Sequence, residues 1–118
     1  MGQTRWHIFT EDGALTLARR MPARFDVAAT TVIEGGAGLR KARVAHQVRQ
    51  DMWRALQNLR GFAPVVRVRS SGDDLEITAG GSVAGRFPKA ETEARIRAVL
   101  DNEHHRARWG RYAKEAKR

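Results

Sequence analysis

Polar and aromatic residues recur at helical spacing in the middle of the chain, at Arg43, His46, Gln50, Trp53, Arg54 and Gln57. Steps of three and four residues place such side chains on one side of a helix. Arginine, histidine and glutamine can hydrogen-bond phosphates and base edges, and an exposed tryptophan can stack on a base or on a partner's side chain. We therefore expect a binding surface centred on Trp53, with a covered Trp53 at the edge of the core as the alternative.

A glycine-rich turn before this helix could bind an anion. Gly35, Gly36 and Gly38 follow a predicted strand, and Arg40 and Lys41 come at the start of the predicted helix. Backbone N–H groups and the helix dipole attract phosphate at such a position. The run fits neither the dinucleotide-binding fingerprint nor the Walker pattern, so an ordinary flexible turn is the alternative.

Residues 106–118 form a basic C-terminal tail in which Arg106, Arg108 and Arg111 alternate with Trp109 and Tyr112. A tail of this kind, whether extended or a frayed helix, can wrap a nucleic acid and become ordered as it binds. In the alternative, the two aromatic side chains attach the tail to the body of the protein while the charges stay in solvent.

A predicted hairpin carries the fourth candidate. Arg67 and Arg69 share one face of its first strand, and Glu76 and Thr78 share one face of its second strand. A cross-strand arginine–glutamate pair is the ordinary outcome. If that face is open instead, the two arginines extend the basic surface of the long helix.

Catalysis and metal binding find little support in the sequence. The chain has no cysteine, which excludes disulfides, thiolate zinc sites and a cysteine nucleophile. No two of its four histidines have the i, i+4 spacing of a helical metal site, and no serine stands in a nucleophile-elbow pattern. We expect no enzymatic activity, no cofactor and no metal.

The first third of the chain predicts strands. Residues 5–10 favour a strand that a turn at 11–13 ends. Residues 14–21 favour a returning strand, with a short helix as the alternative. Residues 25–34 alternate apolar and polar positions at period two, which predicts another strand.

The rest of the chain predicts two helices around a hairpin. Apolar residues at 44, 45, 48, 52, 55, 56 and 59 indicate a helix over residues 39–60. Residues 64–69 and 75–79 predict the hairpin, and residues 80–85 a third short strand or a loop. A second helix is expected from Pro88, and Asn102 could cap a new helix after a kink, unless one helix continues.

These elements predict a single α+β domain over residues 1–118. We expect a small antiparallel sheet of about four to six strands, with the long central helix and a C-terminal helix packed on one face. The element order over residues 39–105 resembles that of double-stranded-RNA-binding domains. Residues 88–93 are mostly acidic or neutral where that family has a lysine-rich run, so the resemblance is confined to topology.

The positive charge is concentrated in two blocks. The net charge is +9, and residues 35–70 hold eight arginines and lysines against Asp51 alone, while residues 106–118 hold six against Glu115. Such surfaces attract polyanions. We therefore expect a small basic protein that binds nucleic acid, RNA or DNA, through the helix over residues 39–60 and the C-terminal tail.

The alternative is a regulatory or adaptor module that docks an acidic protein partner through the same helix, with Trp53 as the anchor. No apolar stretch is long enough to span a membrane, so we expect a cytoplasmic protein without a membrane partner. The oligomeric state stays open.

Overall fold

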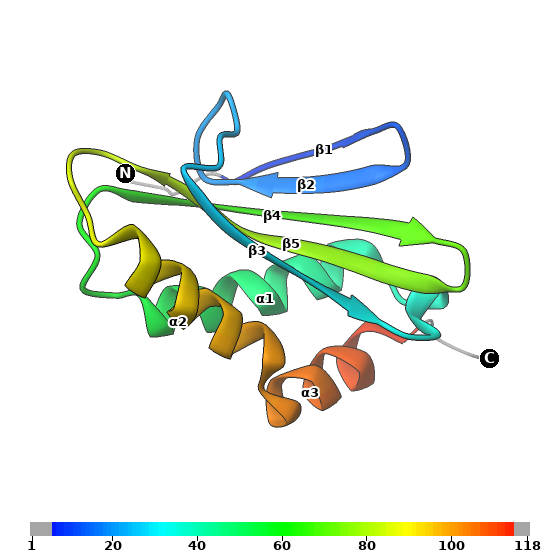
Figure 1. Ribbon diagram of the computed structural model, residues 1–118. Coiled ribbons are helices and arrows are strands. Elements are labelled where there is room, and N and C mark those ends of the chain that lie inside the picture. The colour runs from blue at the N-terminus through cyan, green and yellow to red at the C-terminus, as the bar shows by residue number, and fades with distance from the viewer. Residues whose placement is uncertain (1–5, 115–118) are drawn as a thin grey trace, which may run out of the picture.

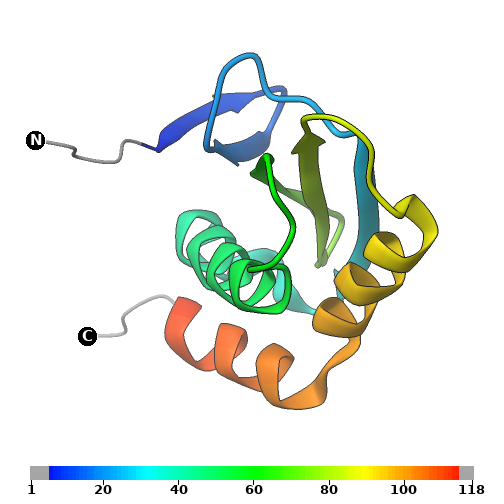
Figure 2. The ribbon, with the colours of Figure 1, turned by 90° about the vertical axis from the view of Figure 1, so that its left-hand side faces the viewer.

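The computed structural model describes residues 6–114, which form one five-stranded antiparallel sheet and three α-helices (Figure 1). The elements are β1 (His7–Glu11), β2 (Ala14–Ala18), β3 (Val27–Ile33), the short 3-10 helix η1 (Gly36–Gly38), α1 (Lys41–Ala55), β4 (Phe62–Ser71), β5 (Asp74–Val83), α2 (Lys89–Asp101) and α3 (Glu103–Ala113). The strand order is β1-β2-β4-β5-β3, and Figure 2 shows all three helices on the same side of the sheet. The predicted α+β fold is confirmed.

A tight turn sets the register of the first hairpin. Asp12 and Gly13 join β1 to β2, and both have positive φ, 54° and 79°. A two-residue hairpin turn needs this backbone, which an Asp-Gly pair adopts easily. The pairing then runs back to His7 opposite Ala18. Residues 14–18 are therefore strand and not helix.

β5 is longer than predicted because two glycines let it pass close to both neighbouring strands. A Cβ atom on Gly80 would lie 1.9 Å from the carbonyl O of Val27, and one on Gly81 would lie 2.2 Å from the carbonyl O of Ala63. Residues 80–83 therefore continue β5, and they form neither a loop nor a separate third strand. Only two strands, β4 and β5, connect α1 to α2. The resemblance to double-stranded-RNA-binding domains required a third strand between these helices, so the structure does not keep that topology.

α1 forms the middle of the helical layer. Its apolar stripe is fully buried and consists of Val44, Ala45, Val48 and Met52. The helix ends at Ala55, sooner than predicted, because Leu56 leaves the helical conformation (φ −116°, ψ 26°). The apolar spacing at 55, 56 and 59 fits both a continued helix and a tight turn, so the sequence pattern did not distinguish them.

The C-terminal helical region divides at Asn102, as the cap interpretation predicted. The Asn102 side chain accepts a hydrogen bond from the N–H of His105 (3.0 Å) and caps α3. α2 buries the apolar side chains of Ile96, Val99 and Leu100. α3 then packs along α1 (Figure 2) and buries Trp109 completely.

Candidate nucleic-acid interface

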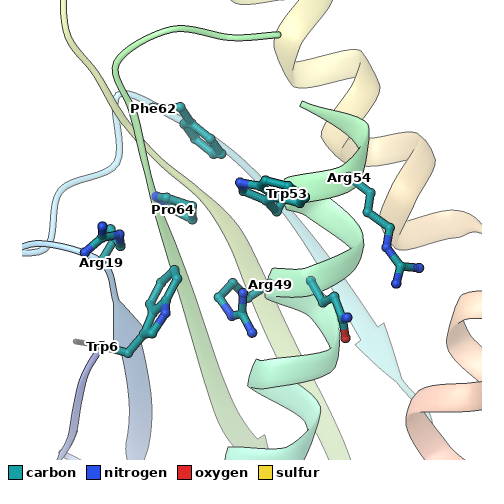
Figure 3. A pocket seen from close by; sticks show the side chains of 8 residues that line it. Trp6, Arg19, Arg49, Trp53, Arg54, Phe62 and Pro64 are labelled. Carbon is teal, nitrogen blue, oxygen red and sulfur yellow. The ribbon is translucent and has the colours of Figure 1, made fainter. Parts of the chain in front are cut away.

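A surface hollow of about 510 Å³ lies along one side of α1, where the helix faces the open end of the β1–β2 hairpin and the start of β4 (Figure 3). Small-ligand sites commonly measure about 300 to 1,000 Å³. We call this hollow the indole groove. Its lining residues are Trp6, Arg19, Arg49, Gln50, Trp53, Arg54, Phe62 and Pro64.

The hairpin side of the indole groove is built by Trp6 and Arg19. His7 pairs with Ala18 at the open end of the hairpin, so Trp6 and Arg19 come next to each other just beyond that pair. The N–H of Arg19 donates a hydrogen bond to the carbonyl O of Pro64 (3.0 Å), which joins this end of the hairpin to β4. The sheet therefore sets the position of this wall.

α1 supplies the opposite wall. The side chain of Trp53 is 54% exposed, so the alternative in which another segment covers it is not observed. In Figure 3, Trp53 extends toward the side where Phe62 and Pro64 lie, whereas the guanidinium group of Arg54 points away from Trp6. The groove thus presents an accessible indole of α1 beside the start of β4.

Two guanidinium groups stack on Trp6. The guanidinium carbon of Arg49 lies 4.7 Å from the centre of the Trp6 ring, and that of Arg19 lies 5.8 Å from it. Both distances are within the roughly 6 Å over which a cation is attracted to an aromatic ring. Figure 3 shows Trp6 between the two arginines. Trp6 therefore holds two positive charges next to each other in the groove.

Arg49 has a donor that no group of the described chain satisfies. Its Nε is buried and makes no hydrogen bond within residues 6–114. Burial lowers the pKa of Arg49 below its ordinary value. A buried unpaired donor costs roughly 1–3 kcal/mol, which the packing of Arg49 against Trp6 and its neighbours has to offset.

The groove is positively charged, and no acidic residue is among the described residues that line it. None of the eight residues that line it is Asp or Glu. Among the described residues, no carboxylate forms an ion pair with Arg19, Arg49 or Arg54. No carboxylate of residues 6–114 therefore neutralises these arginines, and the groove favours an anionic ligand.

His46 lies one turn before Arg49 and Gln50 on α1 but is not among the residues that line the groove. Burial, with a smaller contribution from the charge of Arg49, lowers the pKa of His46 from its ordinary 6.5. The imidazole is therefore mostly neutral at pH 7, and it adds little positive charge beside the groove there.

The basic tail is a packed helix as far as the structure describes it. Trp109 is fully buried, and its Nε1–H donates a hydrogen bond to Oδ2 of Asp51 (2.7 Å). Arg108 forms an ion pair with the same carboxylate. Trp109 thus attaches the tail to α1, as the alternative interpretation predicted, but Tyr112 does not, since it is 53% exposed. Of the charged side chains, Arg111 stays exposed, whereas Arg108 is held by Asp51. Residues 115–118 of the predicted tail lie outside the described residues.

Two further arginines predicted to bind a ligand make contacts within the protein. Arg106 donates hydrogen bonds to the carbonyl O of Val32 (2.6 Å) and to Oγ1 of Thr31 (2.8 Å), at the edge of β3. Arg43 donates to the carbonyl O of Tyr112 (3.3 Å) on the α3 side of α1. The predicted polar surface of α1 is therefore divided between the indole groove and the contact with α3.

The glycine turn uses its donors internally. The N–H of Gly35 donates to Oδ1 of Asp74 (2.9 Å), and the N–H of Arg40 donates to the carbonyl O of Ala113 (2.7 Å). The other two predicted glycines lie within η1, which separates the turn from α1. Anion binding at this turn stays a prediction that these contacts do not support.

Arg67 and Arg69 lie on the face of the sheet opposite the helices. Val66 and Val68, which alternate with them, are buried in the core beneath α1. Arg69 forms the expected cross-strand ion pair with Glu76 (2.9 Å). The prediction that these arginines extend the basic surface of the long helix is therefore wrong, because the period-two alternation of β4 turns them away from α1.

Sequence reasoning found three of the groove residues and missed five. The three that the structure brings together are Gln50, Trp53 and Arg54; the five that were missed are Trp6, Arg19, Arg49, Phe62 and Pro64. Arg49 follows Val48 directly, which places it at the margin of the apolar stripe, and this position was a usable signal. Nothing local connected the other four with α1.

No family model, curated protein or solved structure matches this chain. Within residues 6–114, no three His, Asp or Glu side chains gather in a way that could hold a metal ion. None of the helices in that range is long and apolar enough to cross a membrane. The indole groove is therefore the feature of this protein that points to a function.

Proposed function

We propose that this protein binds nucleic acid, RNA or DNA, at the indole groove. The observation that carries the proposal is the accessible indole of Trp53 in a hollow that also holds Arg19 and Arg49 and that no acidic side chain of residues 6–114 lines. Bases offer aromatic faces for stacking, and the phosphates that join them carry the negative charge that guanidinium groups bind. One ligand class therefore satisfies both features of the groove.

The uneven charge of the whole chain supports the same ligand. The net charge of +9 attracts polyanions over long distances and raises the rate of encounter. An acidic protein partner would be attracted in the same way, with Trp53 as its anchor. Stacking on Trp53 favours nucleic acid over a protein partner. Every base presents a flat aromatic face to an indole, whereas a protein partner has to supply an aromatic side chain at one position.

The test measures the affinity of labelled RNA and DNA oligonucleotides as a function of salt. We expect the logarithm of the affinity to fall linearly with the logarithm of salt concentration, by about 0.7 to 0.9 for each phosphate neutralised. Arg19→Gln combined with Arg49→Gln should weaken binding by about tenfold or more, which corresponds to 1.4 kcal/mol, and should reduce the salt dependence.

A matched control removes two charges elsewhere. Arg95 and Arg97 lie on α2, away from the groove (Figure 2), so Arg95→Gln with Arg97→Gln loses the same charge from another surface. Equal losses in the two double variants would mean that net charge alone attracts the oligonucleotide. No binding at about 50 mM salt, where phosphate contacts are strong, would refute the proposed function and leave a protein partner as the occupant.

A further inference from the structure

We infer that the indole groove holds one unpaired nucleotide, with its base stacked on Trp53 and its phosphate bound by Arg19 and Arg49, so that the ligand is single-stranded nucleic acid. This inference rests on the proposed function and narrows it. It assigns different roles to the two tryptophans of the groove.

Trp6 positions the arginines and is not the stacking surface. Arg19 and Arg49 both lie within cation–π distance of its ring, so its faces are already in use. No cationic or aromatic side chain of residues 6–114 stacks on Trp53, and its side chain is 54% exposed. A base that enters the groove therefore meets the free face of Trp53.

Arg49 is prepared to bind a phosphate. Contact with the Trp6 ring holds its guanidinium group, and no carboxylate of residues 6–114 forms an ion pair with it. A guanidinium group has five N–H donors in a planar arrangement that matches phosphate oxygens. Since the group is already held in place by packing, little side-chain entropy is lost when the phosphate binds.

The position of α1 argues against a duplex ligand. α1 is packed between the sheet and α3, and the β1–β2 hairpin stands beside its groove side, so α1 does not project as a helix that could enter a major groove (Figure 2). In a duplex, neighbouring base pairs also cover both faces of each base. A base has to leave the stack before it can reach Trp53.

The stacking contact predicts weak sequence preference. Every base has an aromatic face, so an indole surface tolerates all four bases. Gln50 is the uncharged polar side chain that lines the groove beside Trp53, and it can bond a base edge. We expect modest discrimination among single strands of different sequence and strong discrimination between single strands and duplex.

The test compares three probes by fluorescence anisotropy: a labelled single-stranded oligonucleotide, its duplex, and an abasic strand of the same length. The wild-type protein should bind the single strand about tenfold or more tightly than the duplex. Trp53→Ala should weaken binding of the single strand by about 5- to 150-fold and leave the abasic strand unaffected. Trp53→Phe should restore most of the loss because it keeps an aromatic face.

Two controls make the result specific. Tyr112 is as exposed as Trp53, 53% against 54%, but lies on α3, so Tyr112→Ala should leave both affinities unchanged. Trp6→Leu should release the arginines and weaken the single strand and the abasic strand by the same factor, which a loss of stacking would not do. A thermal melt followed by circular dichroism confirms that each variant is folded.

The outcomes separate the two proposals. Equal affinity for duplex and single strand, or equal effects of Trp53→Ala and Tyr112→Ala, would overturn the inference while the proposed function stands. Failure of the wild-type protein to bind any of the three probes would overturn both.

Discussion

Asp51 is the residue whose replacement tests the packing of α3 most directly. It lies in α1 and is only 4% exposed. Its Oδ2 accepts a hydrogen bond from the indole Nε1–H of Trp109 (2.7 Å) and forms an ion pair with Arg108. Asp51→Ala removes the acceptor and leaves the buried indole N–H without a partner. We expect this variant to be less stable.

The magnitude follows from two contributions. A buried donor that loses its acceptor costs roughly 1–3 kcal/mol. The side chain of Arg108 is 30% exposed, so water partly replaces its lost ion pair, and this loss should be nearer the about 1 kcal/mol of a surface pair than the cost of breaking a buried one. We therefore expect Asp51→Ala to lower the free energy of unfolding by roughly 2–4 kcal/mol.

Urea denaturation followed by circular dichroism measures this loss. With a slope of about 1–3 kcal/mol per molar urea for a small protein, the midpoint should move by roughly 1 M or more. Arg108→Ala should cost only about 1 kcal/mol. Asp51→Asn should fall between the two, because its carboxamide oxygen can still accept from Trp109. A change within about 0.5 kcal/mol for Asp51→Ala, the size typical of surface substitutions, would refute the reasoning.

Three further predictions concern His46, the sheet and the β3 edge. The pKa of His46 is lowered from 6.5 in the folded protein, so the unfolded chain takes up a proton first as the pH falls. The contribution of His46 to the free energy of unfolding is therefore full above pH 6.5 and declines at lower pH. His46→Gln should flatten this decline in urea titrations at several pH values. Gly80→Ala places a Cβ against Val27 O and should cost roughly 1–3 kcal/mol or more; an unchanged urea midpoint would contradict this. Arg106→Ala removes the hydrogen bond to Val32 O and should lower the free energy of unfolding by roughly 1–2 kcal/mol. It should leave the affinity for oligonucleotides unchanged; a tenfold weaker affinity would mean that Arg106 contacts the nucleic acid.

Local sequence patterns predicted most of the elements. The Asp12-Gly13 turn, the apolar stripe of α1 and the cap at Asn102 each depend on residues within a few positions of one another. The end of α1 was predicted too late, because Leu56 fits a helix by its spacing but leaves the helix in the folded protein. The extent of β5 was missed because Gly80 and Gly81 are typical of a loop or the start of a separate short strand, and only their neighbours in β3 and β4 show that β5 continues through them.

The sequence by itself determined an α+β chain with concentrated positive charge and a tryptophan on the polar side of its long helix. Only the tertiary structure decided which cations meet in the indole groove. Trp6 and Arg49 are far apart in the chain, and their contact depends on the register of β1, β2 and β4 and on how α1 packs beneath them. A shift of one residue in a strand moves its side chains to the opposite face of the sheet. Arg67 faces away from α1 because α1 packs on the opposite face of β4, the face that carries Val66 and Val68.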